Sequence, residues 1–252
     1  MTEEPPRVKA TEHSFQIVEI IRDAGGIGLA GVTAQTEISK SAVYKHVQTL
    51  LRLGYLVRED DTYYLSNRFL SFGRGARERL PLGEIRSIVT DLAATTGNAT
   101  NFIVHETEYG IYSYCIEPGE ESYLPFGEGD VAPLHATAGG KAILAHLAAD
   151  EREELLTDRE LTAYTEKTIT NAGELMTELN TIRSQRVAFD REEYVEGFQC
   201  VASPIIGSDQ EPIGAVSVTG NIQRMSGKRL DEDVAGLVTS AAKSIENEIL
   251  SA

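Results

Sequence analysis

The order of patterns in residues 31–65 constrains the fold more than any other feature of this sequence. The segment reads as a short helix, a tight turn, a longer helix and a small hairpin. Ser39 precedes a run with apolar residues at helical spacing and is a favourable N-cap for the longer helix, which Gly54 ends. Residues 55–57 and 63–65 flank an acidic turn and indicate a two-stranded wing. This order of elements is typical of a winged helix-turn-helix.

The face of the longer helix opposite the apolar residues is polar and basic. Side chains of this kind pair with phosphates or base edges in the major groove of DNA. The alternative is an amphipathic helical hairpin in some other small domain, with Tyr44 packed against the wing. We favour DNA binding because the helices, the turn and the wing arrive in the right order. The residues expected to contact DNA are Ser39, Lys40, Ser41, Tyr44, Lys45 and Gln48 on the helix and Arg58 at the base of the wing.

The net charge of the chain is −16, which is unusual for a DNA-binding protein. The charge is unevenly distributed, because residues 1–80 hold 11 Lys+Arg against 10 Asp+Glu, whereas residues 81–252 hold 12 against 29. Only the first part, at +1, therefore favours contact with phosphates, and the second part, at −17, repels them. Arg outnumbers Lys by 16 to 7. An acidic surface of this kind suits a cytoplasm with molar salt, so we expect a halophilic source.

Several classes of protein are disfavoured by the composition. No apolar run approaches the roughly 20 residues needed to span a bilayer, and the polar residues 1–12 resemble a flexible tail rather than a signal peptide, so we expect a cytoplasmic protein with no membrane contact. Cys115 and Cys200 form no CxxC pair and indicate neither a disulfide framework nor a zinc finger. The five histidines form no HxH or HExxH pair, so we expect no metal and no cofactor.

The chain divides into two predicted domains and a joint. Residues 1–66 make the DNA-binding domain, including the tail over 1–12, and residues 67–81 make a linker helix weakened by glycines. Residues 82–252 make the second domain, in which helices and strands alternate. Helices are expected over 82–96, 138–148, 150–157, 172–186 and 228–250, and strands over 99–106, 109–116, 122–126, 198–206 and 212–219. Strands in hairpins with helices between them predict an α+β fold whose antiparallel sheet is covered by helices.

Two features of the second domain suggest a ligand site. Thr137 is a good cap for a helix whose first turn holds Gly139 and Gly140, and uncovered N–H groups at a helix start favour an anion. The alternative is a glycine-rich turn where the helix packs closely on a strand. Ser217 and Thr219 are two apart on one strand, so their hydroxyls share a face and need partners if that face is buried. The alternative is the solvated face of a half-buried strand.

The longest motifs resemble a known family. The first domain carries GLAGVTAQTEISKSAVYKHVQTLLRLGYLV, and the second carries TTGN, PLHATAGGKAILAHL, YTEKTIT, AFDREEYVEGFQCVASPI and IGAVSVTG. With these segments in this order, nearly the whole chain resembles the IclR family of transcriptional regulators. The resemblance implies a winged helix-turn-helix, a linker helix and a GAF-like effector domain. It also implies homodimers, often paired into tetramers, that bind palindromic operators near catabolic genes and respond to small organic acids, aromatic acids or sugar-derived metabolites.

The resemblance also implies which residues line the effector pocket. The matching positions are Ala138, Gly139, Asp190, Cys200, Ser217 and Thr219. The first two would offer backbone N–H groups to a carboxylate, and the two hydroxyls would donate to the same group. Asp190 would accept from a ligand hydroxyl, and Cys200 would form a weakly polar wall. An acidic residue beside an acid ligand is unexpected, so both an acid and a sugar stay open. From the sequence alone, Lys141 is expected to be a surface or dimer-contact lysine, and contact with an anion is the alternative.

The leading hypothesis is therefore a DNA-binding regulator that either represses or activates, with DNA binding modulated by a metabolite. The rival is an enzyme, because GAF-like domains with catalytic cysteines exist. Cys200 would then need a low-pKa thiolate and a resolving partner. No set of nucleophile, base and orienting group is visible, and no nucleotide motif is present, so we do not expect an enzyme. A constitutive architectural DNA-binding protein would leave the second domain unexplained.

Overall fold

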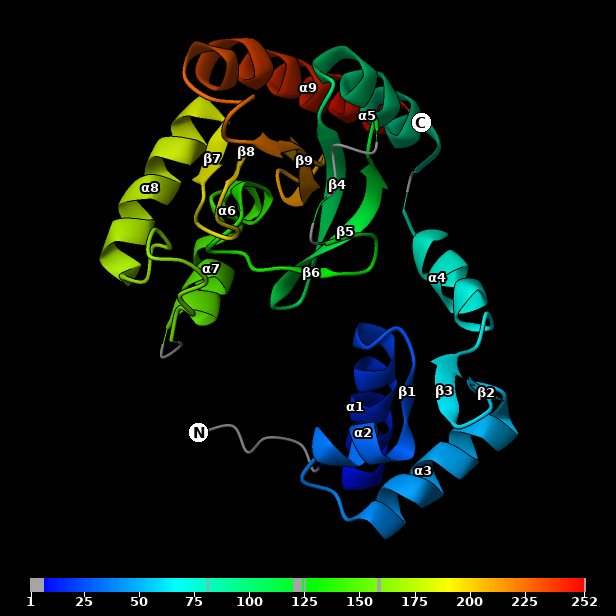
Figure 1. Cartoon of the computed structure of the whole chain (residues 1–252). Coiled ribbons are helices and arrows are strands. Elements are labelled where there is room, and N and C mark those ends of the chain that lie inside the picture. Colours follow the sequence, from blue (N-terminus) through cyan, green and yellow to red (C-terminus); the bar gives the residue numbers. More distant parts are fainter. Residues whose placement is uncertain (1–6, 81, 120–123, 125, 158–159, 252) are drawn as a thin grey trace. The chain divides into compact units, whose positions relative to one another are not determined.

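The computed structural model describes residues 7–80, 82–119, 124, 126–157 and 160–251. Figure 1 traces the chain in sequence colours. The described residues belong to two compact units, Met1–Arg79 and Leu80–Ala252. The α+β class and the winged helix-turn-helix expected from the sequence are confirmed.

The first unit is three helices with a small sheet, followed by a fourth helix. Its helices are α1 (Lys9–Asp23), α2 (Leu29–Ala34), α3 (Lys40–Leu53) and α4 (Phe69–Arg77), and its strands are β1 (Ile27–Gly28), β2 (Leu56–Glu59) and β3 (Thr62–Leu65). The sheet order is β1-β3-β2, and both strand pairs are antiparallel. The core contains Ile17 and Ile21 from α1 and Val43 and Val47 from α3, so these two helices bury their apolar faces against each other.

Local chemistry explains where α3 begins and ends. The Ser39 hydroxyl accepts a hydrogen bond from the Ala42 N–H at 3.4 Å, which confirms the predicted N-cap. Gly54 takes a left-handed conformation with φ of 77°, which a residue with a side chain rarely adopts. The wing strands pair from Leu56 opposite Leu65, as the hairpin pattern predicted. One prediction is wrong: α1 begins at Lys9, so residues 9–12 are helical rather than part of a tail.

The helix α4 runs through two glycines that were expected to weaken it. Phe69 and Phe72 lie one turn apart and contact the Tyr55 ring at 5.6 and 5.8 Å between centroids. Arg68 stacks over the same ring and donates to the Leu53 carbonyl. These contacts dock the start of α4 onto the end of α3 and the wing.

The second unit is built on one six-stranded antiparallel sheet (Figure 1). Its order is β6-β5-β4-β9-β8-β7. The strands are β4 (Ala99–Glu106), β5 (Tyr109–Ile116), β6 (Val131–Ala132), β7 (Ala188–Arg191), β8 (Phe198–Ile206) and β9 (Pro212–Asn221), and the helices are α5 (Leu82–Thr96), α6 (Ala138–Leu144), α7 (Ala149–Leu156), α8 (Ala172–Gln185) and α9 (Ala235–Ser251). A π-helical turn, Arg229–Val234, leads into α9.

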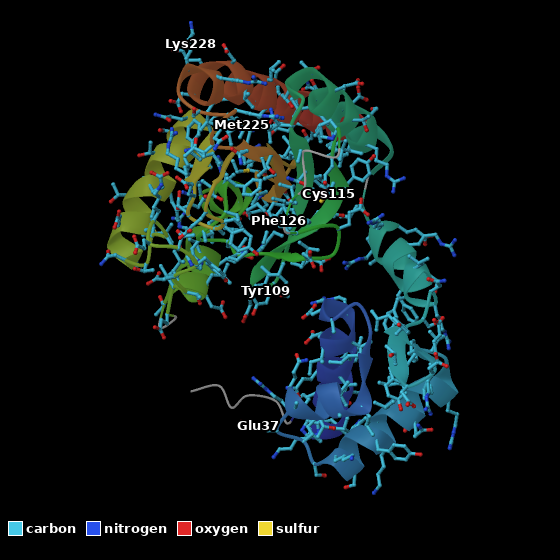
Figure 2. All side chains as sticks on the ribbon, in the orientation of Figure 1. Glu37, Tyr109, Cys115, Phe126, Met225 and Lys228 are labelled. Atoms are coloured by element: carbon cyan, nitrogen blue, oxygen red, sulfur yellow. The ribbon has the colours of Figure 1, made fainter. Side chains whose placement is uncertain are left out.

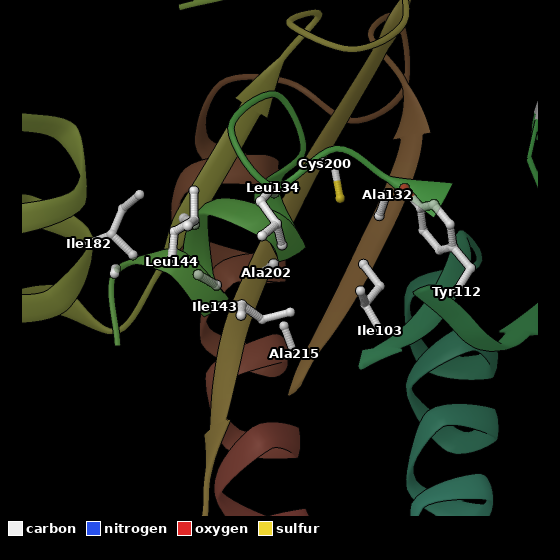
Figure 3. Packing of buried hydrophobic residues seen from close by; sticks show 14 of the residues in the cluster. Ile103, Tyr112, Ala132, Leu134, Ile143, Leu144, Ile182, Cys200, Ala202 and Ala215 are labelled. Atoms are coloured by element: carbon white, nitrogen blue, oxygen red, sulfur yellow. The ribbon is translucent and has the colours of Figure 1, made fainter. Parts of the chain in front are cut away.

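The two faces of this sheet carry two separate cores. One core joins α5 and α9 to the face that holds Phe102 and Val216. The other joins α6 to the opposite face, which holds Ile103 and Ala215, and α8 packs on the far side of α6 (Figure 3). Alternate residues along β4 and β9 thus enter different cores, as strand geometry requires. The short helix α6 is therefore enclosed between the sheet and α8.

Most expected elements of the second unit appear, with some differences. α5, β4, β5 and β8 have the predicted bounds, whereas α6 ends at Leu144 instead of residue 148. β6 and β7 were not expected from the sequence. The strand predicted over 122–126 lies largely outside the described residues, and Leu124 and Phe126, which are described, are not in a strand.

Candidate DNA-binding surface and effector cavity

The outer face of α3 is the candidate DNA-binding surface. Ser39, Lys40, Ser41 and Lys45 are exposed, Tyr44 is 50% exposed, and Gln48 is half-buried. The helix contains no acidic residue, so nothing on it opposes the two lysine charges. An exposed helix with a basic face and free side chains is what the major groove of DNA admits.

Arg58 lies in the wing but is already engaged. Its guanidinium donates to the Asp61 carboxylate at 2.6 Å and to the Asp60 carbonyl at 2.5 Å. The side chain of Arg58 is still 48% exposed, and that of Asp61 is 97% exposed. An exposed pair of this kind contributes little to stability, so a phosphate can compete for the guanidinium.

The candidate effector cavity lies on the α6 side of the second sheet. Thr219 on β9 pairs with Cys200 on β8, which pairs with Asp190 on β7, so the three side chains share one face. Gly139 of α6 faces them across the cavity. Cys200, Ile103 and Tyr112 are visible around this space in Figure 3. The cavity holds about 10 Å³, room for about one water molecule, so a larger ligand must displace its walls.

Aromatic rings close one side of the cavity. Tyr112 stacks on Phe126 with ring centroids 4.3 Å apart, and Phe126 contacts Tyr194 at 6.1 Å. All three residues line the cavity, and Phe126, marked in Figure 2, is almost fully buried. Ring contacts of this kind are individually weak, so these rings form a wall that a ligand can move.

The six expected pocket positions are brought together, although not all of them line the cavity. Gly139, Asp190, Cys200 and Thr219 line it. Ala138 and Ser217 are fully buried beside it. Of the two alternatives for the strand hydroxyls, the solvated face is therefore wrong, because Ser217 is fully buried and Thr219 almost so.

The start of α6 packs as closely as its glycines suggest. A Cβ on Gly140 would lie 2.5 Å from the Leu134 Cα, so no side chain fits there without a backbone shift. The Thr137 hydroxyl caps the helix by accepting from the Gly140 N–H at 3.0 Å. The N–H groups of Ala138 and Gly139 come before the first intrahelical hydrogen bond and are the ones available to a ligand.

Asn101 on β4 is a buried polar residue that the sequence reasoning missed. Its Nδ2 donates to the Ser217 hydroxyl at 3.5 Å and to the Thr219 hydroxyl at 3.4 Å. Thr219 in turn donates to the Cys200 sulfur at 3.2 Å. The Asn101 Oδ1 is buried and has no hydrogen-bond partner among the described residues. The available signal was an asparagine that directly precedes the apolar run over residues 102–104 of β4.

The carboxyl group of Asp190 is buried, and no cationic side chain among the described residues forms an ion pair with it. Its Oδ1 accepts from the N–H of Glu193 at 2.7 Å and of Tyr194 at 3.4 Å. Burial, followed by the nearby Glu193 carboxylate, raises the pKa of Asp190 from 3.8 to about 7. Near neutral pH this group therefore exists in both protonation states.

Lys141 was expected at the surface, and that prediction is wrong. The side chain is 1% exposed, and its Nζ donates to both carboxylate oxygens of Glu193, at 2.6 and 2.8 Å. A third carboxylate oxygen, on Glu178 of α8, lies 3.7 Å away. The ammonium is buried because α6 is enclosed between the sheet and α8, and a buried charge requires a partner.

The buried thiol of Cys200 does not suit an enzyme. Burial, followed by the Asp190 carboxylate, raises the pKa of Cys200 to about 12. A nucleophilic cysteine needs a lowered pKa and a partly exposed, electropositive setting. Among the described residues, no group of three or more His, Cys, Asp or Glu side chains is placed to hold a metal ion.

Together, an exposed basic recognition helix and a small buried polar cavity in a second unit define a class, namely a DNA-binding regulator with a sensor domain. Residues 10–60 match the IclR helix-turn-helix domain, and residues 82–247 match the C-terminal domain of bacterial transcriptional regulators of the IclR type. The chain belongs to the IclR family. Members of this family are transcription regulators rather than enzymes, so the protein is a DNA-binding regulator with an effector-binding C-terminal domain.

Individual relatives cover almost the whole chain. A probable HTH-type transcriptional regulator ArcR from Halobacterium salinarum is 29% identical, over 96% of this chain and 94% of its own length. The HTH-type transcriptional regulator KdgR from Escherichia coli has the same identity and the same coverage. The crystal structure of IclR from Thermotoga maritima is 27% identical with a TM-score of 0.76, over 96% of this chain and 99% of that one.

A solved structure with a ligand shares the fold. An IclR homologue from Microbacterium hydrocarbonoxydans, in complex with 4-hydroxybenzoate, has a TM-score of 0.78 at 18% identity and covers 96% of this chain and all of its own. At that identity the likeness supports the fold alone. In the described part of this chain, no helix is long and apolar enough to cross a membrane.

Proposed function

We propose that this protein controls catabolic genes by binding their operators, and that a small metabolite in the effector cavity alters that binding. The observation that carries the DNA-binding half is the exposed face of α3, which presents Lys40, Tyr44 and Lys45 with no acidic neighbour on the helix. Lys40, Lys45 and Arg58 contact phosphates, and Ser39, Ser41, Tyr44 and Gln48 are placed for the remaining contacts. The strongly acidic second domain keeps the duplex on the first domain alone.

The test of the DNA-binding face is the pair of changes Lys40→Ala and Lys45→Ala in one variant. Operator fragments are first selected from a random DNA pool with the wild-type protein, and binding is then measured by fluorescence anisotropy over a range of salt. We expect specific binding to be abolished while the unfolding temperature and the oligomer size stay unchanged. Lys228→Ala is the matched control, because that lysine is 76% exposed on the second unit (Figure 2) and should bind as the wild type does. Retained operator affinity in the double variant would refute the assigned face.

The effector half of the proposal rests on the polar row across the second sheet. Asp190, Cys200 and Thr219 line one cavity, and the Ser217 hydroxyl is oriented by Asn101 behind it. Donors and acceptors that converge in a buried space are what a small polar ligand requires. A small organic acid would be held by the Ala138 and Gly139 N–H groups and the two hydroxyls, and a sugar would give its hydroxyls to Asp190. A related regulator was solved with 4-hydroxybenzoate, which is a hydroxylated acid.

Asp190→Ala tests the effector half without touching the DNA-binding unit. A thermal-shift screen of small acids, pentoses, hexoses and their oxidised products identifies a ligand for the wild type. A ligand at 100 times its Kd adds about 2.7 kcal/mol to the stability of the folded state. We expect the Asp190→Ala variant to bind operator DNA normally and to lose the ligand's effect on it. An unchanged response would refute the cavity as the effector site.

We further propose that the protein acts as a homodimer, or as a tetramer of two such dimers, on a palindromic operator. Two-fold related recognition helices read two half-sites one helical turn of DNA apart. Phe15 on α1 is 59% exposed, and Leu70 and Phe72 on α4 are 74% and 52% exposed, so these helices offer apolar surface for self-association. Analytical ultracentrifugation of the wild type and of Leu70→Glu tests this, and a monomeric wild type would contradict it.

Two features support the proposal that the protein works in the cytoplasm of a cell with concentrated salt. Acidic residues are in excess over the second domain, and one relative comes from Halobacterium salinarum. Repulsion among clustered carboxylates is screened by salt. We expect the unfolding temperature to rise steadily as KCl is raised from 0.1 M to above 1 M, and a flat dependence would argue against this setting.

A further inference from the structure

Asp190 brings a buried carboxyl group to the wall of the effector cavity. The hydrogen bonds that its carboxylate accepts within the described part of the chain come from two backbone N–H groups, both to Oδ1. None of the described lysines, arginines or histidines forms an ion pair with it. The titratable groups around it are Glu193 and Tyr194 from the loop after β7, Cys200 from β8, Tyr112 from β5 and Lys141 from α6.

Lys141, the described cation that acts on Asp190, is already neutralised. The Lys141 ammonium donates to both oxygens of Glu193, and a second acid, Glu178, lies 3.7 Å from it. With every group ionised, the cluster of Lys141, Glu178, Glu193 and Asp190 carries two negative charges. A carboxylate that enters the cavity beside Asp190 therefore meets a like charge, and burial makes that repulsion much stronger than in water.

Protonation of one of the two carboxylates removes this repulsion. We propose that the effector is a carboxylate and that it is bound together with one proton, which Asp190 takes up from solvent. The balance is one ligand carboxylate, one Asp190 carboxylate and one proton, which combine to a neutral Asp190 that donates its O–H to the ligand oxygen. The buried carboxylate pair then shares a single negative charge instead of two.

Two further observations support this inference. The pKa of Asp190 is already raised to about 7 by burial and by Glu193, so the neutral acid is accessible without a large penalty at physiological pH. The Asn101 amide turns its Nδ2 toward the Ser217 and Thr219 hydroxyls, so the Thr219 hydroxyl is held in the cavity wall and the Ser217 hydroxyl beside it. The inference rests on the proposed function of the cavity as the effector site, and it explains how an acid can bind beside an aspartate.

The test measures affinity and proton uptake together. Lactate, gluconate and 4-hydroxybenzoate are titrated into the full-length protein by calorimetry between pH 6 and 8.5, each in two buffers with different heats of ionisation. Their uncharged amides serve as matched ligands. For an acid that binds, we expect the affinity to fall by up to tenfold per pH unit above pH 7, with nearly one proton taken up per site at pH 8. The corresponding amide should show no such change.

Two variants assign the proton. Asp190→Asn presents a permanently neutral N–H donor, so acids should bind it with an affinity that does not change over this pH range. Glu193→Gln is the comparison: it removes a charge that raises the pKa of Asp190, so the pH dependence should move to lower pH but not disappear, because the proposal places the proton on Asp190. An acid that binds the wild type with constant affinity from pH 6 to 8.5, or an Asp190→Asn variant that keeps the wild-type pH dependence, would overturn the proposal.

The remaining outcomes separate this proposal from the proposed function. Binding of the amides alone would overturn proton-coupled acid binding and leave the cavity as an effector site for neutral ligands. If no acid and no amide binds at pH 6, where Asp190 is mostly protonated, and no sugar stabilises the protein in the thermal-shift screen, the cavity fails as an effector site and both proposals fall with it.

Discussion

Replacing Lys141 with methionine, which has a similar shape and no charge, should strongly destabilise the second unit. At an average separation of about 2.7 Å and an effective dielectric constant of 20, two unit charges attract by about 6 kcal/mol, and the desolvation of both groups offsets part of this. The variant leaves the Glu193 carboxylate buried with no cation in contact. Removing one partner of a buried pair costs about 3–5 kcal/mol, and we expect a loss in this range at pH 8 from urea unfolding.

The protonation of Glu193 gives this prediction a second, independent signature. Burial already raises the pKa of Glu193 in spite of Lys141, and removal of the ammonium must raise it further. The carboxyl group of the variant is then protonated to a greater extent at pH 5 than at pH 8, so the loss of stability should be smaller at pH 5 than at pH 8. The double variant Lys141→Met with Glu193→Leu should recover most of the loss. A loss of unfolding free energy below about 1 kcal/mol at pH 8, or a double variant as unstable as the two single changes added together, would show that the buried Lys141–Glu193 pair does not stabilise the second unit as expected.

Three further predictions concern single residues. The pKa of Asp190 is about 7 in the folded protein and 3.8 when exposed, so between these pH values the folded chain holds a proton that the unfolded chain has lost. The free energy of unfolding should therefore fall by about 4 kcal/mol through this group as pH rises from 4 to 7. Urea unfolding at a series of pH values should show this decrease for the wild type, and Asp190→Asn should lack it. Iodoacetamide at pH 8 should label Cys115 faster than Cys200, because the Cys200 thiol is buried and has a pKa of about 12. Mass spectrometry measures the two labelling rates, and fast labelling of Cys200 would support the alternative of a thiol-dependent enzyme. Gly140→Ala should cost about 1–3 kcal/mol of unfolding free energy because its Cβ meets the backbone of Leu134, and an unchanged urea midpoint would show that this turn can relax.

Long periodic elements of this fold are predictable from the sequence, and short ones are not. α5 and β4 carry enough apolar residues at a regular period for their bounds to be read directly. β1 and β6 have two residues each, and β7 has four, so no period can be recognised in them. These strands exist because a neighbouring strand supplies hydrogen-bond partners, which is information that a local pattern does not contain.

In the candidate site as well, contacts between residues close in the sequence were predictable and contacts between distant residues were not. Thr137 and Ser39 are caps whose partners lie three residues away, so local sequence reasoning was sufficient for them. Lys141 and Glu193 are 52 residues apart, and their pairing depends on how α6 is enclosed, so a surface lysine was the wrong expectation. Asn101 meets Ser217 across 116 residues, and only the register of β4 with β9 brings them together.

If the proposed function is correct, a ligand in the cavity changes the affinity of the protein for DNA, and an operator titration measures that change. A selected operator fragment is titrated by fluorescence anisotropy in concentrated KCl, with and without the ligand found by thermal shift. We predict that the ligand changes the operator Kd of the wild type by at least fivefold, the lower end of typical allosteric couplings, and leaves that of Asp190→Ala unchanged. An operator Kd that stays the same when the wild type is saturated with ligand would contradict the account.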